Sequence, residues 1–186
     1  MQRALNARLT YEDYAAIPSD GRTYQIVDGE LYVTPAPSPF HQRASKRLQR
    51  QLEAYFEDAD RAEVFNAPID LILTNHDVTQ PDLVVVEAAS ITRRGIEAAP
   101  LLVVEVLSPA TVKLDRQVKA RRYAALDVPQ YWILDIDARR LECYANAAGT
   151  FVLSAEGNGD EMVIVPGFDG LTIDLAALWR KQGLGS

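Results

Sequence analysis

The sequence is poor in the residues that build disulfide frameworks and zinc sites. Cys143 is the only cysteine among 186 residues, and His41 and His76 are the only histidines. A single cysteine cannot form an intramolecular disulfide, and the two histidines do not have the spacing of a zinc-binding pair. We therefore expect a reducing, cytoplasmic setting.

Long hydrophobic runs are also missing. No stretch of about 18 apolar residues occurs, and the N-terminal sequence MQRALNARLTYEDY has no apolar run after its arginine. Membrane insertion and export are not expected. The chain also lacks a Gly-rich phosphate loop and a Gly-x-Ser-x-Gly turn, so a small-molecule hydrolase has little support.

The composition is that of an ordinary folded domain. Hydrophobic residues make up 48% and charged residues 24% of the chain. The length predicts a single domain over residues 1–186, large enough to fold without a metal or a disulfide. We find no internal repeat and no linker that would divide it.

Positive charge is concentrated in two short stretches of an acidic chain. The net charge of −7 argues against a protein that coats nucleic acid through bulk charge. Residues 43–50 and 111–126 nevertheless carry +4 each, which leaves −15 on the remainder. These stretches are either solvated helix faces or a rim that faces phosphates. Their basic residues are Arg43, Lys46, Arg47, Arg50, Lys113, Arg116, Lys119, Arg121 and Arg122.

The pattern of apolar and turn-forming residues predicts an α/β domain built on a central mixed sheet. Thr23–Thr34 reads as a hairpin around Asp28-Gly29, the pair preferred by a type I′ turn. Helices are expected over Phe40–Glu57 and Thr111–Leu126, with a short last helix capped by Asp174. Strands are expected at Ala62–Leu73, bent at Pro68, and at Pro81–Glu87, Pro100–Leu107, Gln130–Ile136, Arg139–Ala145, Phe151–Ser154 and Met162–Val165, with a loop at 75–77.

Two carboxylates adjoin strands that read as fully buried. Glu105 is the one charged residue in LLVVEVLS, and Asp82 directly precedes the run Leu83–Val86. An unpaired buried carboxylate is costly or takes up a proton, so Glu105 must have partners. Each acid could instead be structural, Glu105 through an arginine pair and Asp82 as a cap. If they converge, hard oxygen ligands of this kind suit Mg²⁺.

Lys119 is the candidate ammonium group beside such a site. It lies on the helix that follows the Glu105 strand and could fold back across the end of that strand. Asp115 precedes it by four residues, so a surface ion pair along the helix is an equal alternative.

Taken together, several segments resemble the Uma-type family of restriction-endonuclease-like proteins, within the PD-(D/E)XK nuclease superfamily. They are YQIVDGELY, the proline loop ending in His41-Gln42, QPDLVVVE, LLVVEVLSPAT, the helix with Asp115, Lys119 and Tyr123, and VPQYWILDI. The resemblance covers nearly the whole chain. It implies a restriction-endonuclease-like fold and Mg²⁺-dependent hydrolysis of DNA, with Mn²⁺ as a substitute.

The resemblance also implies roles for individual residues. Asp82 and Glu105 would bind the metal, and Lys119 would replace the motif lysine, whose usual position here is Leu107. Glu30 matches an acid of the hairpin, and His41 matches a histidine at the start of the first long helix. The alternative for His41 is a helix-terminal residue with no ligand role. Arg43, Lys46, Arg47, Arg50, Arg116 and Arg122 would flank the DNA, and a homodimer is expected because such nucleases often dimerise.

One departure from the family pattern concerns the hairpin. The family typically has Tyr-Glu there, whereas this chain has Tyr24-Gln25. Glutamine forms hydrogen bonds but carries no charge. The alternative hypothesis is therefore a catalytically weak or inactive module that binds nucleic acid or a protein partner. In either case Tyr131 and Trp132 are expected in the core or at a dimer contact rather than as a base-stacking surface.

Overall fold

A six-stranded mixed sheet forms the centre of the molecule. The computed structural model describes residues 8–180. Only β7 and β8 run parallel, and every other neighbouring pair is antiparallel. The strand order is β10 (Thr150–Asn158), β9 (Arg140–Ala147), β8 (Gln130–Asp135), β7 (Leu102–Val106), β6 (Leu83–Val86) and β3 (Glu63–Asn66). The prediction of a central mixed sheet is confirmed.

A second sheet contains the predicted hairpin. Its order is β2 (Glu30–Thr34), β1 (Thr23–Val27), β5 (Asp77–Thr79) and β4 (Leu71–Thr74). Asp28 and Gly29 have φ values of 53° and 82°, as a type I′ turn requires at both central positions. A small third sheet pairs β11 (Met162–Ile164) with β12 (Thr172–Asp174).

The helices begin where the sequence places capping residues. Ser38 accepts a hydrogen bond from the His41 N–H and Pro39 occupies the first turn of α2 (Pro39–Phe56). Asp174 caps α4 (Leu175–Trp179), as predicted. The remaining helices are α1 (Tyr11–Ala15), the 3₁₀ turn η1 (Ala88–Ser90), the π-helix η2 (Leu114–Lys119) and α3 (Ala120–Ala125), which continues η2.

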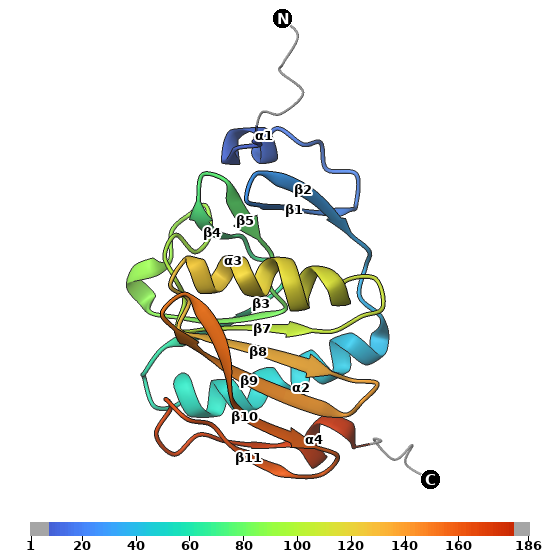
Figure 1. Cartoon of the computed structure of the whole chain (residues 1–186), viewed down its shortest axis with the longest axis vertical. Helices are drawn as coiled ribbons and strands as arrows, with labels where there is room; N and C mark the ends of the chain where they lie inside the picture. The colour runs from blue at the N-terminus through green and yellow to red at the C-terminus, as the bar shows by residue number, and fades with distance from the viewer. Residues whose placement is uncertain (1–7, 181–186) are drawn as a thin grey trace, which may run out of the picture.

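The two long helical segments cover opposite faces of the central sheet (Figure 1). Strand residues alternate between the faces, so Val104 and Trp132 pack toward α2 while Val103 and Tyr131 pack toward α3. Tyr131 and Trp132 are fully buried, which confirms the expectation that they belong to the core. The α3 segment also meets the second sheet, because the Tyr123 hydroxyl donates to Thr79 Oγ1 at 2.8 Å.

Some predicted elements are wrong in detail. The stretch Ala62–Leu73 is not one bent strand: it divides into β3 and β4, which belong to different sheets. Pro68 lies between them and cannot donate to a strand ladder. Residue Asp77, expected in a loop, begins β5. The helix expected from Thr111 begins at Val112, close to the prediction, but runs as a π-helix over Leu114–Lys119. The pattern also missed α1 and β12. Among residues 8–180, no helix is long and apolar enough to cross a membrane.

Asp77 holds the second sheet against α3. Its buried carboxylate accepts hydrogen bonds from the Asp28 N–H at 2.8 Å and from Arg122 Nε and Nη2 at 2.7 Å each. Burial alone would raise the pKa of Asp77, but the bonds from Arg122, Thr74 and the Asp28 backbone outweigh it and lower the pKa. The ionised form therefore stabilises the fold.

We expect Asp77→Asn to lower the free energy of unfolding at pH 7 by about 2–3 kcal/mol, the contribution of a buried charge-assisted hydrogen bond. Because the folded-state pKa is depressed, the wild-type advantage is complete above the unfolded pKa of about 3.9 and disappears as the pH falls through the folded value. Urea denaturation between pH 7 and pH 2 measures this. Asp28→Asn is the matched control: this exposed carboxylate lies 3.6 Å from the same arginine, and its loss should cost under about 1 kcal/mol. Equal effects of the two variants would contradict the assignment.

Candidate functional site

Strand pairing brings Asp82 and Glu105 to one place. In the antiparallel pair β6 and β7, Leu83 lies opposite Val104 and Val84 opposite Val103. Continuing this register by one residue places Asp82 opposite Glu105. The alternation of side chains puts both on the face covered by α3, where opposed Cβ atoms of neighbouring strands lie about 4.5–5.5 Å apart.

Asp82 is fixed by two groups from different elements. Its Oδ2 accepts a hydrogen bond from the Val106 N–H at 2.7 Å and lies 3.3 Å from His41 Nε2. His41, in the first turn of α2, also contacts the Val106 carbonyl through Nε2 at 2.9 Å. Burial alone would lower the pKa of His41, but the hydrogen bond and charge of Asp82 raise it. His41 therefore positions the Asp82 carboxylate and the end of β7.

Glu105 and Lys119 form a buried ion pair. Each residue is only 2% exposed, and Lys119 Nζ donates to Glu105 Oε1 at 2.9 Å. Asp115, also 2% exposed, places Oδ1 3.1 Å from the same ammonium group. The Tyr123 hydroxyl lies 3.4 Å from Glu105 Oε1. The surface ion pair considered for Asp115 and Lys119 is in fact a buried part of the site.

A π-helix delivers Asp115 and Lys119 to the site. Both residues belong to η2. The Asp115 carboxylate lies beside the Lys119 ammonium group, which also donates a hydrogen bond to Glu105. The Tyr131 hydroxyl donates to the Asp115 carbonyl at 2.9 Å and so ties η2 to the central sheet. Segments of π-helix are rare and often occur at functional sites.

Negative charge exceeds positive charge in this cluster. Burial raises the pKa of Glu105, with the Lys119 charge opposing this and the charges of Asp115 and Asp82 adding to it. Burial alone would lower the pKa of Lys119, but Glu105 and Asp115 raise it, so this residue remains an ammonium group. The Lys119 ammonium group contacts two carboxylates, Glu105 and Asp115, while Asp82 contacts His41, so the cluster would gain from a further cation.

The cluster opens into a large cavity of about 1080 Å³. This volume lies just above the range of roughly 300–1,000 Å³ that is typical of ligand sites. Its walls come from the hairpin, the proline-rich segment, α2, β7, η2 and α4. The polar residues at its base are Gln25, His41, Asp82, Glu105, Asp115 and Lys119.

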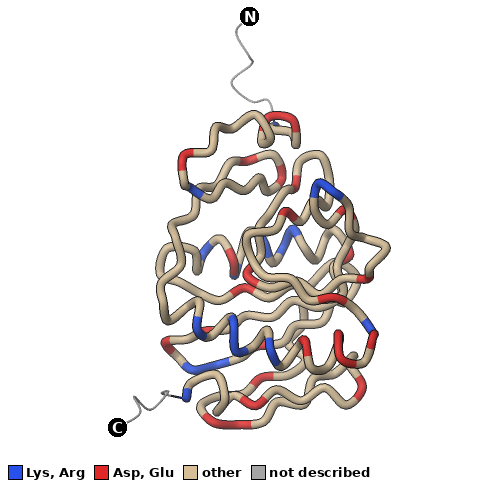
Figure 2. The backbone as a smooth tube through the Cα atoms, turned by 180° about the vertical axis from the view of Figure 1, so that it is seen from behind, with Lys and Arg blue, Asp and Glu red and all other residues tan. Residues whose placement is uncertain are grey.

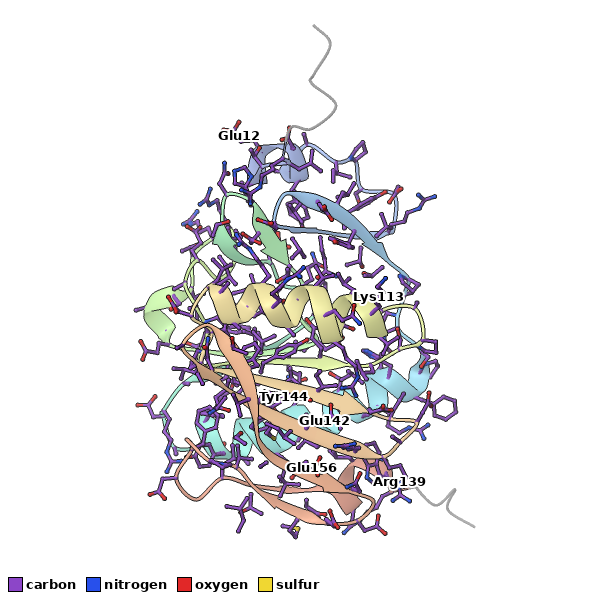
Figure 3. All side chains as sticks on the ribbon, viewed as in Figure 1. Glu12, Lys113, Arg139, Glu142, Tyr144 and Glu156 are labelled. Carbon is purple, nitrogen blue, oxygen red and sulfur yellow. The ribbon has the colours of Figure 1, made fainter. Side chains whose placement is uncertain are left out.

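Three predicted site residues lie elsewhere, and those expectations are corrected. Glu30 is exposed beside the hairpin turn and accepts a hydrogen bond from the Tyr32 hydroxyl, whereas the open end of the hairpin lines the cavity. The guanidinium of Arg122 is held by Asp77, and that of Arg116 lies 2.6 Å from Glu142. Figure 3 shows Glu142 on β9, on the face of the sheet away from α2. Both arginines therefore serve the fold.

The basic residues of α2 follow the prediction more closely. Arg43 and Arg47 line the cavity, and Lys46 lines a smaller adjoining cavity of about 380 Å³ that it shares with His41 and Asp82. Arg50 is exposed one turn further along. Seen from behind, the blue segments of α2 lie on the same side as those of the turn between β8 and β9 (Figure 2). Arg139 of that turn lines the same cavity, which sequence reasoning did not foresee.

Gln25 occupies the place where the family pattern has an acid. It is buried, lines the cavity, and accepts a hydrogen bond from the Gln80 N–H through Oε1 at 3.1 Å. Gln80 in turn donates to Asp70 and to the Tyr14 hydroxyl. The glutamine thus fixes the chain just before Asp82.

The sequence predicted Asp115 only as an ion-pair partner, named Tyr123 as part of a matching helix without giving it a role, and gave no signal for Thr79. The i,i+4 spacing from Asp115 to Lys119 and then to Tyr123 was the available signal, because it places all three on one helix face. Thr79 was not found because β5 was not predicted: its first residue, Asp77, was expected in a loop.

The donor set fits a small hard cation. Within the described residues, Asp82 Oδ1 and Glu105 Oε2 accept no hydrogen bond, and both residues line the cavity. The same part of the chain has no group of three or more His, Cys, Asp or Glu that could hold a metal ion. Magnesium suits such a place, because it keeps several waters and needs only one or two carboxylates together with substrate phosphates.

Comparison with solved structures defines the class of fold. The chain is similar to the crystal structure of a "putative nuclease belonging to DUF820" from Anabaena variabilis ATCC 29413. The two share 18% sequence identity with a TM-score of 0.73, covering 91% of this chain and 97% of the other. The chain therefore shares the fold of that protein.

The sequence comparison gives the family. The Uma2 family, described as "Putative restriction endonuclease", matches residues 11–176. The chain belongs to this family. Comparison with curated proteins gives no match.

Proposed function

We propose that the protein is a Mg²⁺-dependent endonuclease that hydrolyses phosphodiester bonds in DNA. The observation that carries this proposal is the pair of carboxylates, Glu105 and Asp115, around the Lys119 ammonium group, with Asp82 lining the same large cavity. Membership of the Uma2 family and the nuclease fold support the same conclusion.

Asp82 and Glu105 would hold the metal, with Mn²⁺ as a substitute. The ion would supply positive charge at the scissile phosphate and lower the pKa of water. Lys119, held in place by Glu105 and Asp115, would orient the attacking water or balance charge on the phosphate. His41 would keep the Asp82 carboxylate in position through the contact at 3.3 Å.

A plasmid-nicking assay tests the proposal. We expect wild-type protein to nick supercoiled DNA with Mg²⁺ or Mn²⁺ and to stop in EDTA. Asp82→Ala and Glu105→Ala should reduce nicking at least about 100-fold, since even outer-shell substitutions at metal sites cost about 10–100-fold. Equal nicking by all three proteins would exclude this assignment.

A second candidate function is a module that keeps the fold without catalysis. The neutral Gln25 in the cavity and the acidic overall charge favour it. The module would bind nucleic acid or a protein partner through the same face.

Metal-linked stabilisation distinguishes the two functions. For the nuclease, Mg²⁺ or Mn²⁺ at about 100 times its dissociation constant should raise the free energy of unfolding by about 2.7 kcal/mol. At this chain length that is a rise in Tm of about 5–10 °C, measured by thermal denaturation. Asp82→Asn should remove the shift. A wild-type Tm that does not change with either ion would favour the non-catalytic module.

We further propose a homodimer working in the cytoplasm. Cys143 is a buried free thiol whose pKa is raised by burial, in keeping with a reducing compartment. Sedimentation velocity measures the oligomeric state.

A further inference from the structure

The cavity mouth carries an aromatic side chain that the core does not use. Phe40, the second residue of α2, is 68% exposed and lines the cavity. The guanidinium of Arg43 lies 5.6 Å from the centre of its ring. An exposed phenylalanine beside an arginine is a common arrangement for stacking a nucleobase.

The same rim is positively charged. Arg43, Arg47 and Arg139 all line the cavity. Arg47 donates to the Leu178 carbonyl at 2.8 Å, and Arg139 lies over the Trp179 ring and pairs with Asp160. Within residues 8–180, Arg43 has no carboxylate partner. Figure 3 shows Arg139 beside α4, whose Trp179 ring it contacts.

We propose that this rim binds unpaired nucleotides, so that the substrate is single-stranded DNA or a strand with an unpaired segment. The inference rests on the proposed nuclease function and specifies its substrate. The base would stack on Phe40, while Arg43 would contact the neighbouring phosphate. In a duplex both faces of each base are covered by neighbouring base pairs, so a base can reach Phe40 only when it is unpaired or flipped out.

Charge favours this occupant over an apolar partner surface. An apolar surface on a second copy of this chain would pack on Phe40 but would leave the arginines around it without partners for their charge. A DNA strand supplies phosphates for the guanidinium groups and bases for the ring at the same time. The acidic cluster at the base of the cavity then lies beyond the rim, where the backbone would meet it.

Binding without catalysis tests the inference. Fluorescence anisotropy in EDTA, at one fixed salt concentration, compares a labelled poly-dT oligonucleotide with a duplex of equal length. We expect wild-type protein to bind the single strand at least about ten-fold more tightly. Phe40→Ala should weaken single-strand binding about ten-fold and leave duplex binding unchanged. Phe40→Trp should retain the preference, and Phe40→Leu, apolar but not aromatic, should lose it.

Ile164→Ala provides the matched control. Ile164 is 74% exposed on β11 and does not line the cavity, so its removal should change neither affinity. Equal affinity for the two DNAs, or equal weakening of both by Phe40→Ala, would overturn the inference. The inference would also be overturned if Phe40→Ala converted a dimer to a monomer and left the affinity for DNA unchanged. Because no metal is present, these results stand whether or not the protein cleaves DNA.

Discussion

Glu105→Gln is expected to reduce DNA cleavage at least about 100-fold while leaving the protein folded. Glutamine keeps the shape of the side chain, and its carbonyl can still accept from Lys119. It removes the charge that would bind the metal. Plasmid nicking and urea denaturation of the same preparation measure the two effects separately.

The same substitution should not lower stability at pH 7. Burial raises the pKa of Glu105, so keeping this side chain ionised beside Lys119 costs the folded state free energy. Stability from the protonated form is complete below the unfolded pKa of about 4.3 and is lost as the pH rises through the folded value. A glutamine, which does not titrate, escapes this loss. A gain of activity at the expense of stability is common at functional sites.

Glu142→Gln serves as the control, because it should lower stability and leave cleavage unchanged. Glu142 is also buried and pairs with Arg116, but it does not line the cavity. We expect unchanged cleavage and a loss of about 1.5–3 kcal/mol in the free energy of unfolding. If Glu105→Gln were to cleave like wild type, Glu105 would have no part in the reaction.

Lys119→Met should destabilise the protein by about 3–5 kcal/mol at pH 7, because it leaves buried carboxylates without their partner. Methionine is close to lysine in length and apolar, so the loss reports charge rather than shape. Urea denaturation measures the change. Cleavage should be lost as well, since the ammonium group beside the metal site is gone.

A double variant identifies the cause of that loss. Adding Glu105→Gln to Lys119→Met removes one of the uncompensated charges and should recover at least about 1–2 kcal/mol. Lys113→Met is the matched control: Lys113 is exposed just before η2 (Figure 3), and its loss should change stability by under about 0.5 kcal/mol. Additive effects of the two substitutions would show that the ion pair is not coupled.

The fold was largely predictable because its main elements carry local signals. The type I′ turn at Asp28-Gly29, the cap at Ser38 and the unbroken Val/Leu runs of β6 and β7 agree with one another and with the tertiary structure. Where the pattern failed, tertiary contacts decide. Asp77 belongs to a strand only because β1 and β4 flank it.

The centre of the site was predictable for a similar reason. A lone carboxylate within an apolar strand demands partners, which identified Glu105. Asp82 before a buried strand and Lys119 on the following helix also stood out in the sequence, and the resemblance to the family then implied their roles. The surroundings were not predictable, because charge alone cannot tell an arginine that faces a cavity from one that faces a carboxylate. Arg47 and Arg116 both read as basic helix residues, yet only Arg47 lines the cavity.

The strand register that places Asp82 opposite Glu105 also determines when the site exists. The site draws on α2, β6, β7 and η2, which span residues 39–119, and no pair among His41, Asp82 and Glu105 is close in sequence. Closing such distant loops is favourable only when the central sheet assembles. A nascent or partly unfolded chain therefore holds its acidic groups apart, and the capacity to attack DNA arises with global folding in a single cooperative step.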